Sequence, residues 1–270
     1  MENDLSEPVV LNRLQTNWLG HTYHYFASVG STNQLLKQHS ATENLPAGTV
    51  YLADYQEAGR GRLSRKWEAP PRTSLLFSVL FRPSWPPLQA NWLTMMASLA
   101  AAEAIEALTA LTVAVKWPND LMIMAQGVWH KPAGILLEGD LAEDGRLRSV
   151  VLGIGINVNI PAAQLPEAVT PATSLLAAAG LLVPRLPLLL DVLTRLEAYY
   201  DAADQGESPQ PAWNRRLMML GQPVQVTLTA GGRRISGIAA ATDRWGQLLV
   251  RDEVGTLHTI AAGDVTLRGG

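Results

Sequence analysis

The 270-residue chain contains no cysteine. This absence excludes disulfide bridges, thiolate metal ligands and a cysteine nucleophile. It also favours a reducing, cytoplasmic compartment, because secreted domains more often carry disulfides. Charge is scarce as well, since 21 basic and 24 acidic side chains leave a net charge of −3. A protein that coats nucleic acid needs an excess of lysine and arginine, so the composition argues against that class.

Long apolar runs and several catalytic motifs are also missing. The acidic start of the chain lacks the basic residues and apolar stretch of a signal peptide. The longest uncharged stretch, residues 83–102, contains Pro86, Pro87, Gln89 and Asn91, which argues against a membrane helix. Neither the nucleophile motif of serine hydrolases nor the phosphate loop of P-loop enzymes occurs, and the five histidines form no zincin pair. We therefore expect a soluble protein without these chemistries.

What is present is a pattern of short apolar strands and amphipathic helices. Capping or helical spacing predicts helices after Ser31, over residues 92–108 and over residues 188–200. Apolar runs predict strands at residues 23–27, 49–53, 74–81, 112–115, 121–124, 133–138 and 150–156, the last four as antiparallel neighbours. Four glycine-separated strands, at residues 224–228, 234–238, 248–250 and 257–260, are typical of a small barrel. We place a domain boundary near Leu220, between residues 1–220 and 221–270.

The first candidate site is a basic loop that contains glycine. Residues 56–67 read Gln-Glu-Ala-Gly-Arg-Gly-Arg-Leu-Ser-Arg-Lys-Trp, and four cations are therefore close together, at Arg60, Arg62, Arg65 and Lys66. Glycine permits backbone conformations closed to other residues, so such a loop can wrap an anion with N–H and guanidinium groups. A solvated basic loop or a nucleic-acid patch is the alternative.

Three further segments lie at the ends of predicted strands. Residues 116–120 (Lys-Trp-Pro-Asn-Asp) leave a strand at a proline, and Asp120 can hold a hard cation such as Mg²⁺, although turn chemistry alone favours a simple turn without a ligand. Lys131 precedes a strand, where it is either a solvent-facing charge or a cation placed against a phosphate or carboxylate. Residues 153–157 (Gly-Ile-Gly-Ile-Asn) interrupt a strand with glycine, which permits close approach of a ligand.

Taken together, these segments resemble the biotin protein ligase family, also called biotin–[acetyl-CoA-carboxylase] ligases. The resemblance covers Ser31–Asn33, the arginine loop, residues 116–120, Lys131 with residues 133–136, and residues 153–157, in the family's order and spacing. It implies an α+β fold, with a mixed sheet and flanking helices like those of class II aminoacyl-tRNA synthetases and a small C-terminal SH3-like β-barrel. It also implies the activity. Biotin and MgATP would give biotinyl-5′-AMP and pyrophosphate, and the anhydride would acylate one lysine of a biotin carboxyl carrier protein or domain.

The resemblance also implies roles for individual residues. Lys131 would neutralise the biotin carboxylate and the α-phosphate, and Arg62 would act with it as the second catalytic cation. The biotin-binding set would be Ser31, Thr32, Asn33, Gln56, Gly59, Arg60, Gly61, Arg62, Trp67, Lys131 and Gly134. ATP would contact Arg65, Lys66, Lys116, Asn119 and Asn157, and Asp120 would hold Mg²⁺.

The sequence departs from the family pattern in three places. Gly30 stands where an acidic residue usually precedes Ser31, and Ser64 stands where the loop usually carries a glycine. The segment before the first predicted strand is too short for the winged helix with which bifunctional members bind operator DNA. We therefore expect a ligase-only protein, a monomer or homodimer, with no DNA or membrane partner. The alternatives are a lipoate or octanoate ligase or transferase of the same superfamily and a non-catalytic ligand-binding scaffold.

Overall fold

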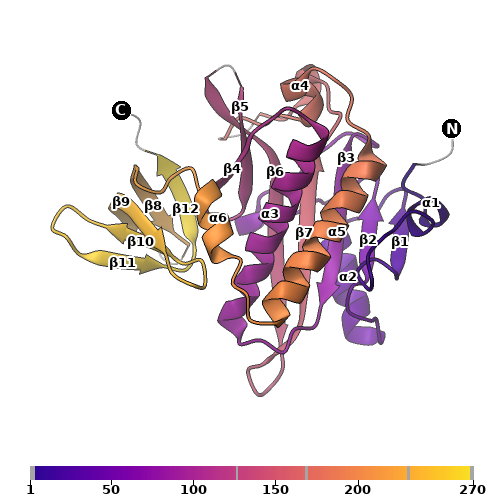
Figure 1. Ribbon diagram of the computed structural model, residues 1–270, viewed down its shortest axis with the longest axis horizontal. Coiled ribbons are helices and arrows are strands. Elements are labelled where there is room, and N and C mark those ends of the chain that lie inside the picture. Colours follow the sequence, from indigo (N-terminus) through magenta and orange to yellow (C-terminus); the bar gives the residue numbers. More distant parts are fainter. Residues whose placement is uncertain (1–3, 126, 168–169, 230–231, 268–270) are drawn as a thin grey trace.

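The computed structural model describes residues 4–125, 127–167, 170–229 and 232–267, which form a helix-covered mixed sheet with a second, smaller sheet beside it (Figure 1). The helices are α1 (Glu7–Leu11), α2 (Thr32–Thr42), α3 (Asn91–Leu108), α4 (Leu175–Ala179), α5 (Arg185–Asp204) and α6 (Gln210–Arg216). Three short 3-10 helices are η1 (Arg62–Ser64), η2 (Pro87–Ala90) and η3 (Ala162–Gln164). No helix among the described residues has the length and apolar character needed to cross a membrane.

The larger sheet has seven strands in the order β1-β2-β3-β7-β6-β5-β4. Its strands are β1 (Tyr23–Phe26), β2 (Val50–Ala53), β3 (Ser74–Phe81), β4 (Val113–Lys116), β5 (Asp120–Ala125), β6 (Val128–Leu141) and β7 (Leu147–Asn157). Only β1 and β2 run parallel; the remaining pairs are antiparallel. The predicted mixed sheet is thus confirmed, and so is the prediction that β4 to β7 pair as antiparallel neighbours.

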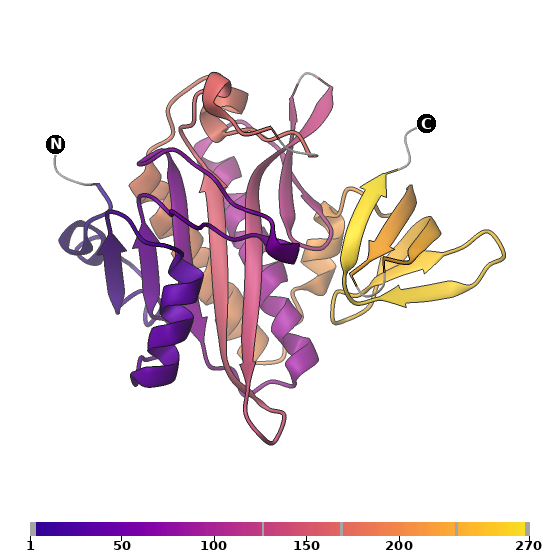
Figure 2. The same cartoon turned by 180° about the vertical axis from the view of Figure 1, so that it is seen from behind.

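The two faces of this sheet are covered differently. Helices α3 and α5 pack against each other and over one face, in front in Figure 1, while α2 packs on β3 and β7 from the other side (Figure 2). Helix α3 is rich in alanine, a strong helix former, and apolar around most of its circumference, so it is buried along nearly its whole length. The long connection between β2 and β3 crosses the face of the sheet that α2 covers (Figure 2).

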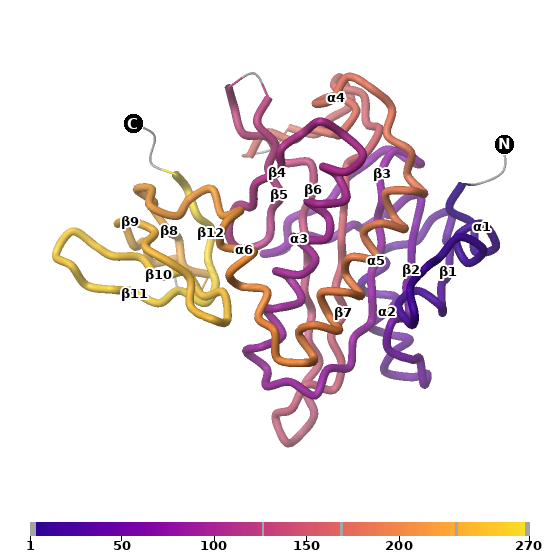
Figure 3. The backbone as a smooth tube through the Cα atoms, in the orientation of Figure 1, coloured from indigo at the N-terminus to yellow at the C-terminus, as the bar shows by residue number. Residues whose placement is uncertain are grey.

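The smaller sheet has the antiparallel order β11-β10-β9-β8-β12. Its strands are β8 (Pro223–Leu228), β9 (Arg234–Thr242), β10 (Leu248–Arg251), β11 (Leu257–Ile260) and β12 (Gly263–Leu267). Among the described residues β11 and β12 stay unpaired with each other, so the predicted small barrel is an open sheet. The backbone trace shows it lying beside β4 and α6 (Figure 3). The division at residues 220 and 221 stays a prediction.

Two segments differ from the sequence prediction. The polar segment 201–211, which follows the helix predicted at residues 188–200, begins as the last turn of α5 and ends in α6. Strand β12 follows the four predicted C-terminal strands and pairs with β8 along its whole length. Its alternation of Asp264 and Thr266 with Val265 is a weak apolar signal, because only every second side chain faces the core.

Candidate functional site

A cleft of about 530 Å³ opens on the face that α2 shares with the β2–β3 connection. We call residues 55–72, which join β2 to β3 across this cleft, the lid. With the exception of Gly59, every predicted site residue lines the cleft: Ser31, Thr32, Asn33, Gln56, Arg60, Gly61, Arg62, Arg65, Lys66, Trp67, Lys116, Asn119, Asp120, Lys131, Gly134 and Asn157. Residues from five separate parts of the sequence thus converge on one site.

The lid is a small hairpin. The Gly61 N–H donates to the Arg65 carbonyl at 2.7 Å, and the Trp67 N–H donates to the Gly59 carbonyl at 3.0 Å. A Cβ on Gly59 would lie 2.2 Å from the Trp67 carbonyl oxygen, so only glycine permits this pairing. Ser64, where the family usually has glycine, has a φ of 60°, the left-handed backbone that glycine adopts most readily.

Buried charges hold the base of the lid. The Arg72 N–H donates to the Asp54 carbonyl at 3.1 Å and so brings the two ends of the lid together. The Asp54 carboxylate is 4% exposed and accepts hydrogen bonds from Arg185 at 2.7 Å and from the Tyr25 hydroxyl at 2.7 Å. Neither Asp54 nor Arg185 was predicted from the sequence, because they are 131 residues apart and belong to no shared motif.

One end of the cleft is neutral and rich in hydrogen-bonding groups. The side-chain oxygen Oε1 of Gln56 accepts from the Thr32 N–H at 2.8 Å and from the Thr32 hydroxyl at 3.1 Å. Ser78, a fully buried residue of β3, lies 2.7 Å from that hydroxyl and donates to Asn33 Oδ1 at 2.5 Å. Short polar side chains at the start of α2 are typical of a helix N-terminus, where they replace missing backbone partners. Among the described residues the N-cap side chain, Ser31, makes no such capping hydrogen bond, and it lines the cleft together with Thr32 and Asn33.

The strand glycines make room for side chains of the site itself. A Cβ on Gly153 would lie 2.2 Å from Asn33 Oδ1, and one on Gly155 would lie 2.8 Å from the Trp67 indole. A Cβ on Gly134 would lie 3.0 Å from the same ring. The close approach that we predicted for a ligand at residues 153–157 is therefore made first by Asn33 and Trp67.

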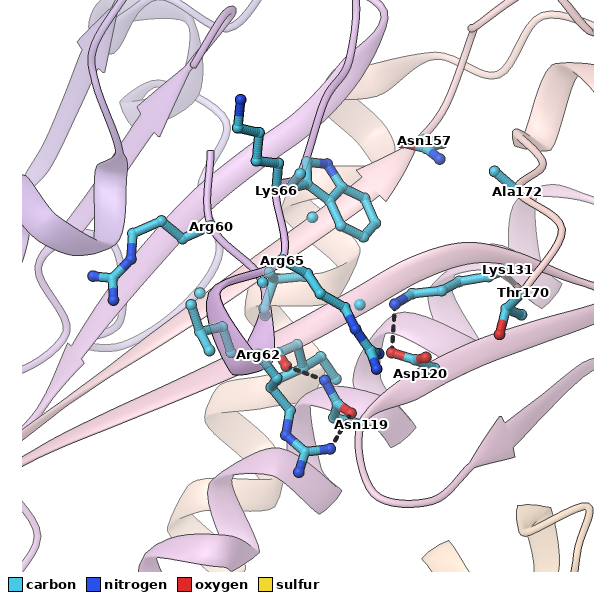
Figure 4. Close-up of a pocket in the computed structure, with 18 of the residues that line it drawn as sticks. Arg60, Arg62, Arg65, Lys66, Asn119, Asp120, Lys131, Asn157, Thr170 and Ala172 are labelled. Atoms are coloured by element: carbon cyan, nitrogen blue, oxygen red, sulfur yellow. Dashed lines mark hydrogen bonds and ion pairs between the residues drawn. The ribbon is translucent and has the colours of Figure 1, made fainter. Parts of the chain in front are cut away.

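The other end of the cleft is cationic (Figure 4). The Lys131 ammonium lies 2.6 Å from Asp120 and 5.6 Å from the centre of the Trp67 ring. The Lys116 ammonium donates to Thr170 at 3.2 Å, and burial lowers its pKa although the nearby Asp120 carboxylate acts in the opposite direction. Burial likewise lowers the pKa of Arg62. Because burial disfavours these positive charges, an anion that enters the cleft gains cations with little hydration to lose.

The C-terminal sheet contributes to this cationic end. Arg62 donates to Asn119 Oδ1 at 3.2 Å and to the Gly263 carbonyl at 3.4 Å, and Arg65 forms an ion pair with Asp264 of β12. Lys66 differs from these cations, because its side chain points away from Asp120 and Lys131 (Figure 4). Asp264 was not predicted as a site residue. It is 199 residues from Arg65, and nothing in the sequence indicates that the two side chains meet.

Two buried polar atoms at the wall of the cleft lack a partner among the described residues. They are Trp67 Nε1 and Asn157 Oδ1, while the Asn157 amide nitrogen donates to the Thr173 carbonyl at 3.1 Å. A buried polar atom without a partner is costly, so such atoms commonly meet a ligand or water. The indole face suits a planar heterocycle, and the unpaired Asn157 acceptor suits an amino group on the edge of such a ring.

The described residues contain no cluster of three or more His, Cys, Asp or Glu side chains that would hold a metal. Asp120, the predicted Mg²⁺ ligand, is paired with Lys131 at 2.6 Å. Protein sites for Mg²⁺ often consist of one or two carboxylates together with substrate phosphates. Asp120 thus fits a metal ion that arrives on a nucleotide better than it fits a resident metal.

Comparison with known proteins points in one direction. Residues 25–157 match the model of the biotin/lipoate A/B protein ligase family. Residues 219–268 match the model of the biotin protein ligase C-terminal domain. The chain is 37% identical to the biotin–[acetyl-CoA-carboxylase] ligase of Mycobacterium tuberculosis, over 88% of this chain and 86% of that protein. It is 33% identical to the bifunctional ligase/repressor BirA of Bacillus subtilis, over 97% and 79%. The solved biotin protein ligase from Aquifex aeolicus in complex with biotin and ATP superimposes with a TM-score of 0.73 at 29% identity, over 92% of this chain and 99% of that one.

Proposed function

Because the chain belongs to the biotin protein ligase family, we propose that biotin and ATP react in this cleft and that the lid covers their product. The chain is a biotin ligase enzyme, as its relatives and the matching structures with biotin and ATP support. The finer assignments below, residue by residue, are our proposal. A carrier protein as acceptor, a reducing compartment and a monomeric or dimeric state stay predictions.

One observation carries the assignment of substrates to the cleft, namely that a neutral polar end adjoins a cationic end. Biotin has a ureido ring, which both donates and accepts hydrogen bonds, and a carboxylate at the end of an apolar chain. The hydroxyls of Ser31 and Thr32 and the Gln56 amide suit the ring, and Lys131 suits the carboxylate. Lipoate and octanoate have no such polar ring, so they would displace water from these groups without offering hydrogen bonds in return, which is costly.

The first step joins two anions. A carboxylate oxygen of biotin attacks the α-phosphorus of ATP, an oxygen–phosphorus bond forms, and the bond from that phosphorus to pyrophosphate breaks. Lys131 would neutralise the carboxylate and the α-phosphate, with Arg62 and Lys116 supplying further positive charge at the same end. Cations fixed in advance stabilise the developing negative charge without reorganising during the reaction. Backbone bonds of Lys131 to Pro171 and Thr173, at 2.8 and 3.1 Å, hold its position.

The nucleotide base would lie against Trp67. Asn157 Oδ1 would accept from an amino group on the edge of the base. The Trp67 N–H lies in the plane of the indole, so it would donate to a water rather than to the stacked base. ATP would arrive with Mg²⁺, for which Asp120 would be a protein ligand once the phosphates engage Lys131. In this role the metal supplies positive charge to the phosphates.

In the second step the amine of a carrier lysine attacks the acyl carbon of biotinyl-5′-AMP. An amide bond forms, the acyl–oxygen bond breaks, AMP leaves and a proton is released. The anhydride is prone to hydrolysis, so it must be kept from water until the carrier arrives. The hairpin lid, with Arg60, Arg62 and Arg65 fixed to different elements, would provide this cover.

The test is to incubate the purified chain with ATP, Mg²⁺ and biotin, and to follow pyrophosphate release and label transfer to a biotin carboxyl carrier domain. Octanoate and lipoate serve as control acids. We expect release and transfer with biotin and neither with the control acids. A preference for octanoate or lipoate would instead support the alternative ligase or transferase, and binding of biotin without pyrophosphate release would support a non-catalytic scaffold.

A further inference from the structure

Glu138 of β6 connects the lid to the neutral end of the cleft. One carboxylate oxygen lies 3.2 Å from Arg60 Nη1, in the lid, and the other accepts from Asn33 Nδ2 at 3.0 Å, in the first turn of α2. Its side chain is only 16% exposed. Glu138 lies opposite Val151 in the part of β6 that pairs with β7, so the central sheet fixes its backbone.

The contacts of Asn33 continue this connection around the neutral end. Asn33 is 4% exposed, accepts from Ser78 at 2.5 Å and fits only because residue 153 is glycine. Ser78 in turn lies 2.7 Å from Thr32, which contacts Gln56 at the start of the lid. A continuous series of polar contacts therefore leads from the beginning of the lid, through α2 and the sheet, back to the lid at Arg60.

The arginines of the lid are held at two separate places, one at each end of the cleft. Arg62 and Arg65 are fixed at the cationic end, to Asn119, Gly263 and Asp264. Arg60 points away from that group (Figure 4), and among the described residues Glu138 is its ion-pair partner. Phosphates that enter the cationic end will compete for Arg62 and Arg65, because those cations face them. Arg60 and Glu138 are outside that competition.

We propose that Glu138 is a positioning residue that fastens the biotin end of the lid and thereby sets how long the reaction intermediate stays bound. The inference rests on the proposed function, because it takes the intermediate to be biotinyl-5′-AMP. Glu138 touches neither reacting atom; it acts through Arg60 on the lid and through Asn33 on the wall of the cleft. Loss of its charge should free the lid while leaving the cations of the reaction in place.

The central variant is Glu138→Gln, which keeps the shape and an acceptor for Asn33 but removes the charge that Arg60 faces. Asp140→Asn is the matched control, since Asp140 lies two residues further along β6 and pairs with Arg148 at 3.5 Å, away from the lid. We expect preformed, labelled biotinyl-5′-AMP to dissociate about tenfold faster from Glu138→Gln, as loss of a charge-assisted hydrogen bond implies. We expect wild-type release from Asp140→Asn, and a similar rate of pyrophosphate formation at saturating substrate in all three proteins.

A double-mutant cycle with Arg60→Gln identifies the partner. If Glu138 acts through Arg60, Glu138→Gln will add little to the release rate in the Arg60→Gln background. Release from Glu138→Gln at the wild-type rate, or fully additive effects of the two changes, would overturn the proposal. A melting temperature within the range of the control variant shows that the effect is not a general loss of fold.

A second measurement separates this proposal from the proposed function. Trypsin cleavage within the lid of the ligand-free protein needs no intermediate, and the lid offers it arginine and lysine residues. We expect faster cleavage there in Glu138→Gln than in Asp140→Asn, and equal rates would refute the fastening. If the wild-type chain formed no biotinyl-5′-AMP at all, the proposed function would fail whatever the cleavage result.

Discussion

Replacing Gly153 by alanine should damage the neutral end of the cleft. Gly153 lies in the middle of β7, between Ser78 of β3 and Leu136 of β6. A Cβ there would be 2.2 Å from Asn33 Oδ1 and 2.8 Å from Asn33 Cγ, where an ordinary contact is 3.4 Å or more. The two strands that flank β7 hold the backbone, so the Asn33 side chain has to move.

The magnitude follows from what Asn33 loses when it moves. Asn33 would give up its short hydrogen bond with Ser78 and its contact with Glu138, each worth about 0.5–1.5 kcal/mol net. Overpacking in a rigid core adds about 1–3 kcal/mol. We therefore expect the free energy of unfolding to fall by about 2–6 kcal/mol. If roughly half of that change is felt at the binding site, the affinity for biotin falls about fivefold or more.

The assay is calorimetric titration with biotin together with urea unfolding, and Gly139→Ala is the control. Gly139 lies in β6 like Gly153 in β7, but a Cβ there meets only Leu147, at an ordinary 3.6 Å. We expect Gly139→Ala to keep both stability and biotin affinity, because a strand tolerates an added methyl group where there is space. A Gly153→Ala protein with wild-type stability and wild-type biotin affinity would refute the reasoning that this glycine exists to admit Asn33.

Three other changes test other parts of the structure. Lys131→Met should slow pyrophosphate release by about 10²-fold or more, yet change the free energy of unfolding by only about 1 kcal/mol, because the pair with Asp120 is partly solvated; an unchanged rate removes Lys131 from its role. Gly155→Ala should displace the Trp67 indole and raise the KM for ATP by about tenfold, with a smaller effect on biotin binding, and equal effects on both substrates would contradict a base site at Trp67. Glu197→Gln should lower the free energy of unfolding by about 2–4 kcal/mol at neutral pH, because Glu197 accepts from the N–H groups of residues 17–19 at 2.7–2.8 Å. Burial alone would raise the pKa of Glu197, but these donors lower it below its usual value. The stabilisation by Glu197 is therefore fully present above the usual pKa and is lost as the pH falls through the folded-state pKa. Urea unfolding of both proteins at several pH values should show the stability difference between them shrink in acid, and a constant difference would refute this reasoning.

The central sheet was predictable because its apolar runs are short and clearly bounded. Residues 74–81 form a strand over the whole predicted range, since all eight side chains are buried and no polar alternation obscures the run. The helix at residues 92–108 differs by one residue from α3, because its apolar spacing persists to its last turn. The C-terminal strand β12 could not be predicted in the same way, because only Val265 and Gly263 of its five residues are buried.

The site residues likewise fall into a predictable group and a group that could not be predicted. Lys131, Asn119 and the lid arginines lie in dense motifs, so a sequence resemblance identifies them together. Ser78 and Glu138 occupy strands whose neighbours are ordinary apolar residues, and nothing in their spacing distinguishes them from residues that only pack. Their function depends on which strands become neighbours in the sheet, and pairing of strands distant in sequence is a property of the folded chain.

The distribution of charge explains why a protein with a net charge of −3 can bind anions in this cleft. Lys131, Arg62, Arg65 and Lys116 repel one another when no ligand is present, and the burial of Arg62 and Lys116 strengthens that repulsion because it removes water. Asp120 and Asp264 relieve the repulsion, each paired with one of these cations. A phosphate has the same sign as these carboxylates, so it can replace them at their cations without a change in the sign of the local charge. Because Asp264 comes from the C-terminal sheet, that sheet is part of the cationic end, and removing it should expose unpaired charge at the site as well as apolar surface beside it.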